Sequence, residues 1–587
     1  SNINNGAIAN STFTSTNSAT EGIYLDTVSG NFDISDSTIT ITNPTDNGIF
    51  ATNIQGTTTI SANTGSQITT EGNKAGIFLS DSTGTINLSG VTVGSTGGAV
   101  VEVSNINNGA IANSTLTSTN SATQGISLDT VSGSFDISDS TITIENPTDN
   151  GIFATNIQGT ATISANTGSQ ITTQGNQAGI SLTESTGAIN LSGVTVSSTE
   201  GAVVEVSNIN NGAIANSTFT STNSATAGIS LDTVSGNFDI SDSTITIENP
   251  ASNGILATNI QGSATISANQ GSQITQANQG IELSDSTGAI AISGFEIRNT
   301  QNSGISGTNL GNVTLANNRI EGATNEGIYL ADTDGEVTIS QNAIINIIGV
   351  VDPDPTNPLD FPTGQGILLN NVTGIVEVSL NTISGTIGFN PGLPIPPSGQ
   401  GIVINNDTGS VNITLSDNSL FDNYEDAILI GLGVPFGDPI VNLRIEGNTI
   451  ENNGGSNPTR GDGIGIGMEN NALIENLTIS GNTLIGNFDD GIDIRMGEIF
   501  PNATAQIQQA IIENNEITDN VQQGINIELF KQTEIFMNVV SNIINNNSTD
   551  VIVQPNTTGE ICFYFSGNSD NATFDLNGIT PNNSSCF

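Results

Sequence analysis

The stretch Gly22–Pro44, GIYLDTVSGNFDISDSTITITNP, decides the fold of this chain. Within it, three runs alternate apolar and polar residues with a period of two: GIYL, NFDIS and TITIT. Turn-forming residues separate these runs, and the pattern predicts three short β-strands joined by tight turns. Because strands this short cannot bury an apolar face alone, the segment must stack on copies of itself as one coil of a parallel β-solenoid.

The same pattern recurs along the chain, as a solenoid requires. SNINNGAIANST begins at Ser1, at Ser104 and at Ser207, which is a repeat of 103 residues. Four shorter units fill the first long repeat, and a glycine before an apolar alternation marks each of them: Gly22, Gly48, Gly76 and Gly98. Similar marks continue to about Val551, so we predict an all-β solenoid of roughly 20 coils.

From Gly304 onward, an asparagine stands at the corner before the third strand of each coil: Asn318, Asn342, Asn381, Asn418, Asn448, Asn482, Asn515 and Asn542. Asparagine tolerates the left-handed backbone that a sharp bend needs, and stacked copies can hydrogen-bond one another. In this feature the chain resembles the right-handed parallel β-helix family, the pectate-lyase-like proteins with an asparagine ladder. The resemblance implies a right-handed β-helix over almost the whole chain. It implies little about function, because this fold hosts lyases, hydrolases, phage spikes, adhesins and inert rods.

Loop content divides the chain into three expected parts. Residues 1–279 are regular and consist of duplicated 103-residue, four-coil cassettes. Residues 280–558 carry the asparagines and several insertions, including Val350–Gly364 and Gly388–Gly399, which flank the first strand of their coils. Residues 559–587 break the pattern and are expected to cover the last coil as a cap. Since long loops on a regular scaffold commonly carry function, we expect any groove to follow the first sheet of the second half.

Charge and composition exclude several classes of function. The chain has 7 Lys+Arg against 56 Asp+Glu, a formal net charge of −49, which disfavours nucleic acid and anionic membranes as partners. No run of about 20 apolar residues is present, so no membrane span is predicted. The two cysteines, Cys562 and Cys586, can form a disulfide, which would imply an extracellular or cell-surface location; two free thiols are the alternative.

Three aspartates form a candidate metal site. Asp426, Asp462 and Asp490 occupy equivalent positions on successive coils and are therefore expected about 4.8 Å apart. Like charges this close are unfavourable unless a cation, an arginine or a shared proton intervenes. Calcium suits carboxylate oxygens, whereas Arg460 and Arg495 could neutralise the aspartates instead. Two interpretations therefore stay open: a calcium site, or solvated turn aspartates with arginine partners.

The segment FDDGIDIR, Phe488–Arg495, looks like the paired-aspartate motif of polygalacturonase-type glycosidases, in which neighbouring carboxylates act as general acid and base. That family also needs a Gly-His-Gly motif, and this chain has no histidine. The neighbouring coils YEDAILI, GDGIGIG and QQGINIE share the same frame, so we interpret FDDGIDIR as coil consensus. We predict no catalytic residue, no enzymatic activity and no cofactor other than the calcium considered above.

Aromatic residues occupy outward positions of the first sheet near the start of the chain. If Ile and Leu of each GIxL run point inward, then Tyr24, Phe50, Phe78 and Val100 point outward on consecutive coils. A line of exposed aromatic side chains is unusual on a solvated surface and indicates a contact with another molecule. Ser1 opens within a repeat, so we also expect an unpaired coil edge beside these residues.

These observations together predict head-to-tail self-assembly, because a contact that repeats without closing produces a fibre. Tyr24, Phe50 and Phe78 are the predicted interface. The principal functional hypothesis is therefore an extracellular structural or adhesive rod that forms homo-oligomers or filaments. The alternative is a protein that binds or cleaves polysaccharide through the first-sheet groove between about Gly401 and Glu528.

Overall fold

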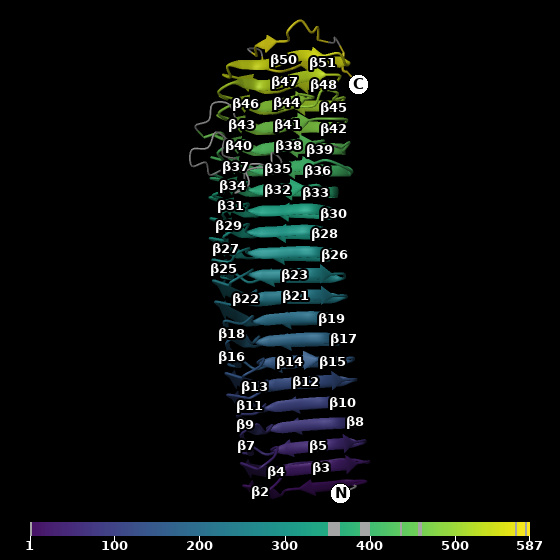
Figure 1. The fold of residues 1–587 in the computed structure, drawn as a ribbon, viewed down its shortest axis with the longest axis vertical. Coiled ribbons are helices and arrows are strands. Elements are labelled where there is room, and N and C mark those ends of the chain that lie inside the picture. The colour runs from purple at the N-terminus through teal and green to yellow at the C-terminus, as the bar shows by residue number, and fades with distance from the viewer. Residues whose placement is uncertain are drawn as a thin grey trace. The chain divides into compact units, whose positions relative to one another are not determined.

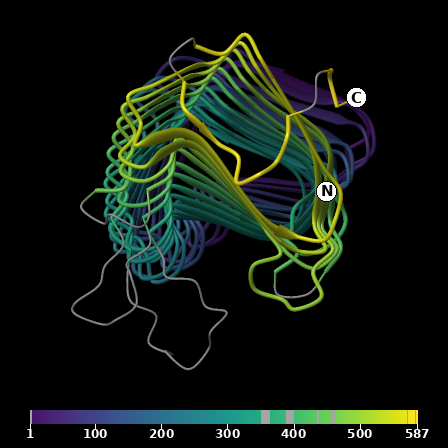
Figure 2. The same ribbon diagram turned by 90° about the horizontal axis from the view of Figure 1, so that it is seen from above.

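A computed structural model describes residues 3–349, 364–387, 399–434, 437–455, 461–569, 572–581 and 584–586. The chain divides into two compact units, Ser1–Ala277 and Asn278–Phe587. In each unit the strands follow one another as coils of a parallel solenoid, and no described residue lies in a helix (Figure 1). Seen end on, successive coils of a unit trace nearly the same outline (Figure 2). The predicted all-β solenoid is confirmed.

One coil of the first unit shows how the sequence makes this fold. Strand β8 (Ile77–Ser89) turns the corner between the first and second sheets, and β9 (Thr92–Thr96) forms the third. Ile77 pairs with Val101 of β10 (Val101–Ala112), and Val93 pairs with Leu116 of β11 (Thr115–Thr119). All four residues are fully buried. The period of two in the sequence thus places one set of side chains in the core and the other outside.

The glycine before each first strand leaves room for a side chain of the third sheet. A Cβ atom on Gly76 would lie only 2.4 Å from Cγ1 of Val93. In the next coil Val100, not Gly98, holds this position, since its carbonyl accepts the N–H of Ile77 at 3.0 Å. Val100 is fully buried, and Glu102 faces outward opposite Phe78. The prediction that Val100 points outward is therefore wrong.

Side chains at the corner between the second and third sheets join one coil to the next. In the first unit these are serines: Ser37 Oγ accepts the N–H of Ser11 at 3.1 Å, and Ser66 Oγ accepts that of Ile39 at 3.0 Å. In the second unit the predicted asparagine ladder is confirmed and extends to Asn568. Each Nδ2 donates to the next Oδ1 over 2.9–3.1 Å from Asn318 onward.

The prediction that the ladder asparagines themselves adopt a left-handed backbone is wrong. The left-handed backbone belongs to the residue before each ladder asparagine, such as Asn317 with φ 56° and Gln341 with φ 57°. The ladder asparagines are selected for their hydrogen bonds instead. The structure also contains a second asparagine ladder, which we did not predict from the sequence. Its residues lie five positions after those of the first ladder, and their Nδ2–Oδ1 distances are 2.8–3.1 Å: Asn423, Asn453, Asn487, Asn520 and Asn547.

The solenoid continues beyond the boundary expected at residue 558. Strand β51 (Ile561–Ser566) pairs in register with β48 (Glu534–Val540), with Ile561 opposite Ile535. The first part of 559–587 is therefore a further coil and not a cap. Cys562 and Cys586 form a disulfide with a Cα–Cα distance of 5.8 Å, which ties the last described residues to this coil.

The ladder makes a strong prediction about stability. Replacing Asn448 with Ala removes its side-chain bonds to Asn418 and Asn482, and the buried N–H of Asn418 loses Asn448 Oδ1 as its acceptor. We expect the free energy of unfolding to fall by about 3 kcal/mol, measured by urea denaturation. The control Asn442→Ala removes two exposed asparagine–asparagine bonds from the same coil and should change it by less than about 0.5 kcal/mol. Equal losses in the two variants would contradict the structural role of the ladder.

Candidate carboxylate site

The candidate site lies on the first sheet of the second unit. Four adjacent strands build it: β38 (Ile428–Leu432), β41 (Ile464–Met468), β44 (Ile492–Met496) and β47 (Gln523–Lys531). Their inward isoleucines Ile428, Ile464, Ile492 and Ile525 pair in one fully buried column. The next residue of each strand faces outward, which aligns Leu429, Gly465, Asp493 and Asn526.

The turns before these strands hold the three predicted aspartates at equivalent positions. Asp426 Oδ1 accepts the N–H of Asp462 at 2.8 Å, and Asp462 Oδ1 accepts that of Asp490 at 2.9 Å. Asp490 Oδ1 accepts the N–H of Gln523 at 2.6 Å. Asp462 and Asp490 are only 7% and 2% exposed, so the interpretation of solvated turn aspartates is wrong for these two.

Asp493 joins the cluster from the outward face of β44. One carboxylate oxygen from each of Asp462, Asp490 and Asp493 lies within 4.8 Å of the others. Arg495 Nε lies 2.7 Å from Asp493 Oδ2, and Asn526 Nδ2 donates to Asp493 Oδ1 at 3.0 Å. Arg495 therefore pairs with Asp493 rather than with the aspartate ladder. Arg460, the other arginine expected here, lies outside the described residues.

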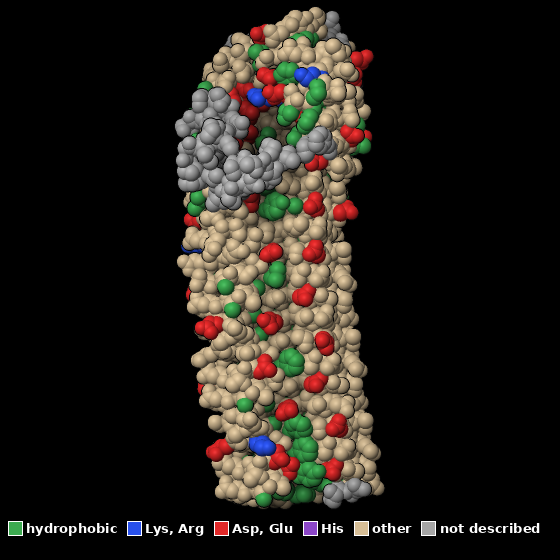
Figure 3. Space-filling view, viewed as in Figure 1, with side chains coloured by type: hydrophobic (Ala, Val, Ile, Leu, Met, Phe, Trp, Pro, Cys, Tyr) green, Lys and Arg blue, Asp and Glu red, His purple; other side chains and the backbone are tan. Residues whose placement is uncertain are grey.

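Two outward glycines of β41, Gly465 and Gly467, contribute no side chains beside these carboxylates. A Cβ atom on Gly465 would lie 3.3 Å from Cδ1 of Leu429 and 3.7 Å from an Oδ2 atom of both Asp426 and Asp462. One on Gly467 would have a single neighbour at 4.0 Å. Figure 3 shows this face of the molecule hollowed near its upper end, where side chains of both charges gather. Two insertions were expected to border this face, Val350–Gly364 and Gly388–Gly399. Of these, residues 350–363 and 388–398 lie outside the described residues.

Burial makes ionisation of the cluster unfavourable. It raises the pKa of Asp490 to about 8, and the Asp493 charge adds to this effect. Burial also raises the pKa of Asp493 to about 7, although the Arg495 charge opposes the shift. For Asp489, burial raises the pKa to about 6, again against Arg495. At neutral pH, protonated and ionised carboxyl groups therefore coexist in one small space.

The pKa of Asp462 is also raised, by burial first and then by the charges of Asp426 and its other acidic neighbours. A raised pKa means that the folded chain holds protons which the unfolded chain has already released. The cluster consequently opposes folding increasingly as pH rises from about 4 to about 8. Either protons or a bound cation can relieve this cost.

The sequence placed Asp426, Asp462 and Asp490 together but missed Asp493 and Asn526. Asp493 lies within FDDGIDIR, which was interpreted as coil consensus. In the neighbouring coils its position holds Leu429, Gly465 and Asn526. The signal was therefore an aspartate that departs from the consensus at an outward position of the first strand.

The three aromatic residues of the first unit form a continuous stack. Tyr24 of β3 (Ile23–Val28) pairs with Phe50 of β5 (Ile49–Ile54), which pairs with Phe78. Their ring centroids are 5.5 and 5.2 Å apart, and Tyr24 is 52% exposed. The outward orientation predicted from sequence is correct for these three residues.

Comparison with known proteins identifies the family. A family model for the right-handed β-helix region matches residues 178–344 and 365–579. The chain belongs to the right-handed β-helix family. This β-helix has no match among curated proteins in a sequence comparison. Among the described residues, no helix has the length and apolar character to span a membrane.

Solved structures similar to this β-helix include the periplasmic alginate epimerase AlgG. The two chains are 12% identical with a TM-score of 0.29, and the match covers 68% of this chain and 76% of the epimerase. A mutant form of the same epimerase matches at 13% identity, with the same TM-score and a coverage of 77% of its chain. These similarities concern the fold alone.

The cluster fits a hard divalent cation. Calcium prefers several oxygen ligands at about 2.3–2.6 Å, and carboxylate oxygens within 4.8 Å of one another can share one ion. We expect millimolar calcium to raise the melting temperature relative to chelator, because the ion binds only the folded chain. The increase should be larger at pH 8 than at pH 6, since protons compete for the same oxygens.

The variant Asp490→Asn should lose this response, while the exposed control Asp519→Asn should keep it. Identical melting curves in chelator and in calcium at pH 8 would exclude a calcium site here.

Proposed function

We propose that this chain is an extracellular protein that binds and hydrolyses an uncharged polysaccharide at the carboxylate site. The observation that carries the proposal is a close group of buried carboxyl groups with different pKa values. These groups lie beside the outward glycines Gly465 and Gly467. Strongly perturbed carboxyl groups in a cleft are typical of functional sites. An extracellular location suits the Cys562–Cys586 disulfide, because such bonds persist in oxidising compartments.

The surroundings of Asp490 and Asp493 favour different catalytic roles for their carboxyl groups. Asp490, with its pKa raised to about 8, keeps its proton at neutral pH and can donate it to the oxygen of a leaving sugar. Asp493 accepts a hydrogen bond from Asn526 and forms an ion pair with Arg495, and both interactions favour its ionised form. Asp493 is therefore the better nucleophile or base. This pair needs no histidine, so the missing Gly-His-Gly motif does not exclude hydrolysis.

The separation of the two carboxyl groups bears on the stereochemistry. Enzymes that invert configuration hold a water molecule between carboxyl groups about 6.5–9.5 Å apart, whereas retaining enzymes use about 5–5.5 Å. The oxygens of Asp490 and Asp493 lie within 4.8 Å of each other, which leaves little room for that water. We therefore expect retention through attack by Asp493.

The substrate class follows from charge. A formal net charge of −49 repels polyanions, so pectin and alginate are not expected as substrates. Among the described residues, Arg495 is the one cation in contact with the cluster, and Asp493 already pairs with it. An uncharged glycan meets no such repulsion.

The test is release of reducing ends from a panel of neutral polysaccharides in the presence of chelator. We expect Asp490→Asn and Asp493→Asn each to lower kcat at least about 100-fold, as for loss of a catalytic acid or base. Activity should fall as pH rises through about 8, where Asp490 loses its proton. The control Asp519→Asn should retain activity. No cleavage of any neutral glycan, or full activity in both site variants, would overturn the proposal.

Self-assembly is the second candidate function, and the stack of Tyr24, Phe50 and Phe78 favours it. Three stacked rings expose apolar surface that a partner copy could cover. We expect Phe50→Asp combined with Phe78→Asp to leave the fold intact and to dissociate assemblies into monomers, measured by light scattering. The control Phe153→Asp with Leu256→Asp changes isolated outward residues of the same sheet and should leave assembly unchanged. A monomeric wild-type chain at high concentration would contradict this function.

A further inference from the structure

The third sheet of the first unit carries a regular column of threonines on its outer face. Its strands include β2 (Thr12–Thr16), β7 (Gln67–Glu71), β9, β11 and β13 (Ser134–Glu145). Pairing between strands aligns eight threonines with one glycine and one glutamine, here called the threonine column: Thr16, Thr42, Thr69, Gly94, Thr117, Thr143, Gln170, Thr195, Thr218 and Thr244. The column carries no charge.

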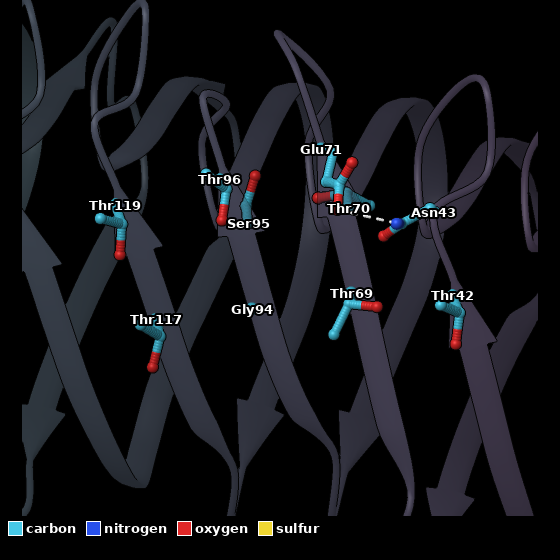
Figure 4. A pocket seen from close by; sticks show the side chains of 10 residues that line it. All are labelled: Thr42, Asn43, Thr69, Thr70, Glu71, Gly94, Ser95, Thr96, Thr117 and Thr119. Carbon is cyan, nitrogen blue, oxygen red and sulfur yellow. Dashed lines mark hydrogen bonds between the residues drawn. The ribbon is translucent and has the colours of Figure 1, made fainter.

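A second column lies beside the first on the same face. It is rich in hydroxyl groups but also holds two carboxylates: Glu71, Thr96, Thr119, Glu145, Thr172, Ser197, Thr220 and Thr246. Figure 4 shows part of this grid, with Thr42, Thr69 and Thr117 in one row and Thr96 and Thr119 in the next. Strand spacing sets a repeat of about 4.8 Å along the columns, and two residues along a strand set about 6.6 Å between them.

The side chains of this grid are held in place and remain available. Threonine is stiff at χ1, because two heavy atoms on Cβ restrict its rotamers, and the inward neighbours Ile68, Val93 and Leu116 are fully buried. Thr69 Oγ1 donates to the Ile41 carbonyl at 3.3 Å. In the part of the chain that the structure describes, no protein group bonds the hydroxyls of Thr42 and Thr117.

A shallow hollow of about 380 Å³ interrupts the grid at Gly94, lined by Thr42, Thr69, Thr96 and Thr117 among others. A Cβ atom on Gly94 would meet nothing within 4 Å, so the missing side chain makes the hollow. Hydroxyl groups on three sides of it can bond ordered water molecules. The face thus offers both a periodic grid and a site for water within it.

We propose that this face binds ice. A rigid two-dimensional array of hydroxyl and methyl groups with regular repeats can order water in a lattice that ice can share. Preorganisation limits the entropy lost on binding, because neither backbone nor side chains must be fixed. The lack of charge on the threonine column also matters, since a charged group would orient water around itself. This activity is independent of the carboxylate site.

The test measures ice growth with the full chain. We expect a gap between the melting and freezing temperatures of a single ice crystal and inhibition of recrystallisation. Thr117→Lys combined with Thr143→Lys places two charges in the threonine column and should reduce both effects at least ten-fold. The control Ser127→Lys with Thr162→Lys places the same charges on the other two sheets of nearby coils, on β12 (Ile126–Val131) and β15 (Thr160–Ala165), and should keep them.

Circular dichroism and the melting temperature establish that both double variants fold. Absence of any effect of the wild-type chain on ice growth would overturn the proposal, as would full activity of the Thr117→Lys, Thr143→Lys variant. If the wild-type chain instead forms assemblies that this variant disperses, with no effect on ice, the face is an interface between copies and the proposal is wrong.

Discussion

Parallel hydrogen bonding between successive coils is the constraint on which the rest of this structure depends. It fixes the register of every strand, and a slip by one residue would turn the buried isoleucine column Ile428, Ile464, Ile492 outward. Buried asparagines reinforce the register in the second unit, where each amide satisfies the next. Once register is fixed, any residue type that recurs at one position of the coil becomes a column on the surface or in the core.

The threonine column and the aspartate cluster are both columns of this kind, but the electrostatic cost of repeating the residue differs between them. Threonines can repeat at no electrostatic expense, whereas aspartates at one position repel one another. Asp426, Asp462 and Asp490 offset part of that cost, because each accepts an N–H from the next coil. Asp493 is outside this ladder and adds another buried charge to it. Its ion pair with Arg495 and its hydrogen bond from Asn526 offset part of this cost, and the proposed function gives it a chemical role.

The sequence predicted the solenoid, the disulfide partners and the first asparagine ladder, because local alternation and repeated corner residues determine them. It failed where neighbours from other coils decide the outcome. Val100 faces inward because the pairing of Ile77 with Val101 places Val100, and not Gly98, at the position that precedes the first strand. Asp462 and Asp490 are buried, although turn aspartates are usually exposed, and no local spacing reveals burial. Asp493 was missed because we interpreted its segment as coil consensus, although an aspartate at this outward position departs from that consensus.

The central claim is that close stacking of coils forces the aspartate cluster to hold protons at neutral pH. Infrared spectroscopy of the cation-free chain at pH 7 tests this claim most directly, because a neutral carboxyl group has a C=O stretching band that a carboxylate lacks. The account predicts such a band in the wild-type chain and its loss or weakening in Asp490→Asn, with no change in Asp519→Asn. A spectrum with no neutral carboxyl band, or a band that Asp490→Asn leaves unchanged, would contradict it.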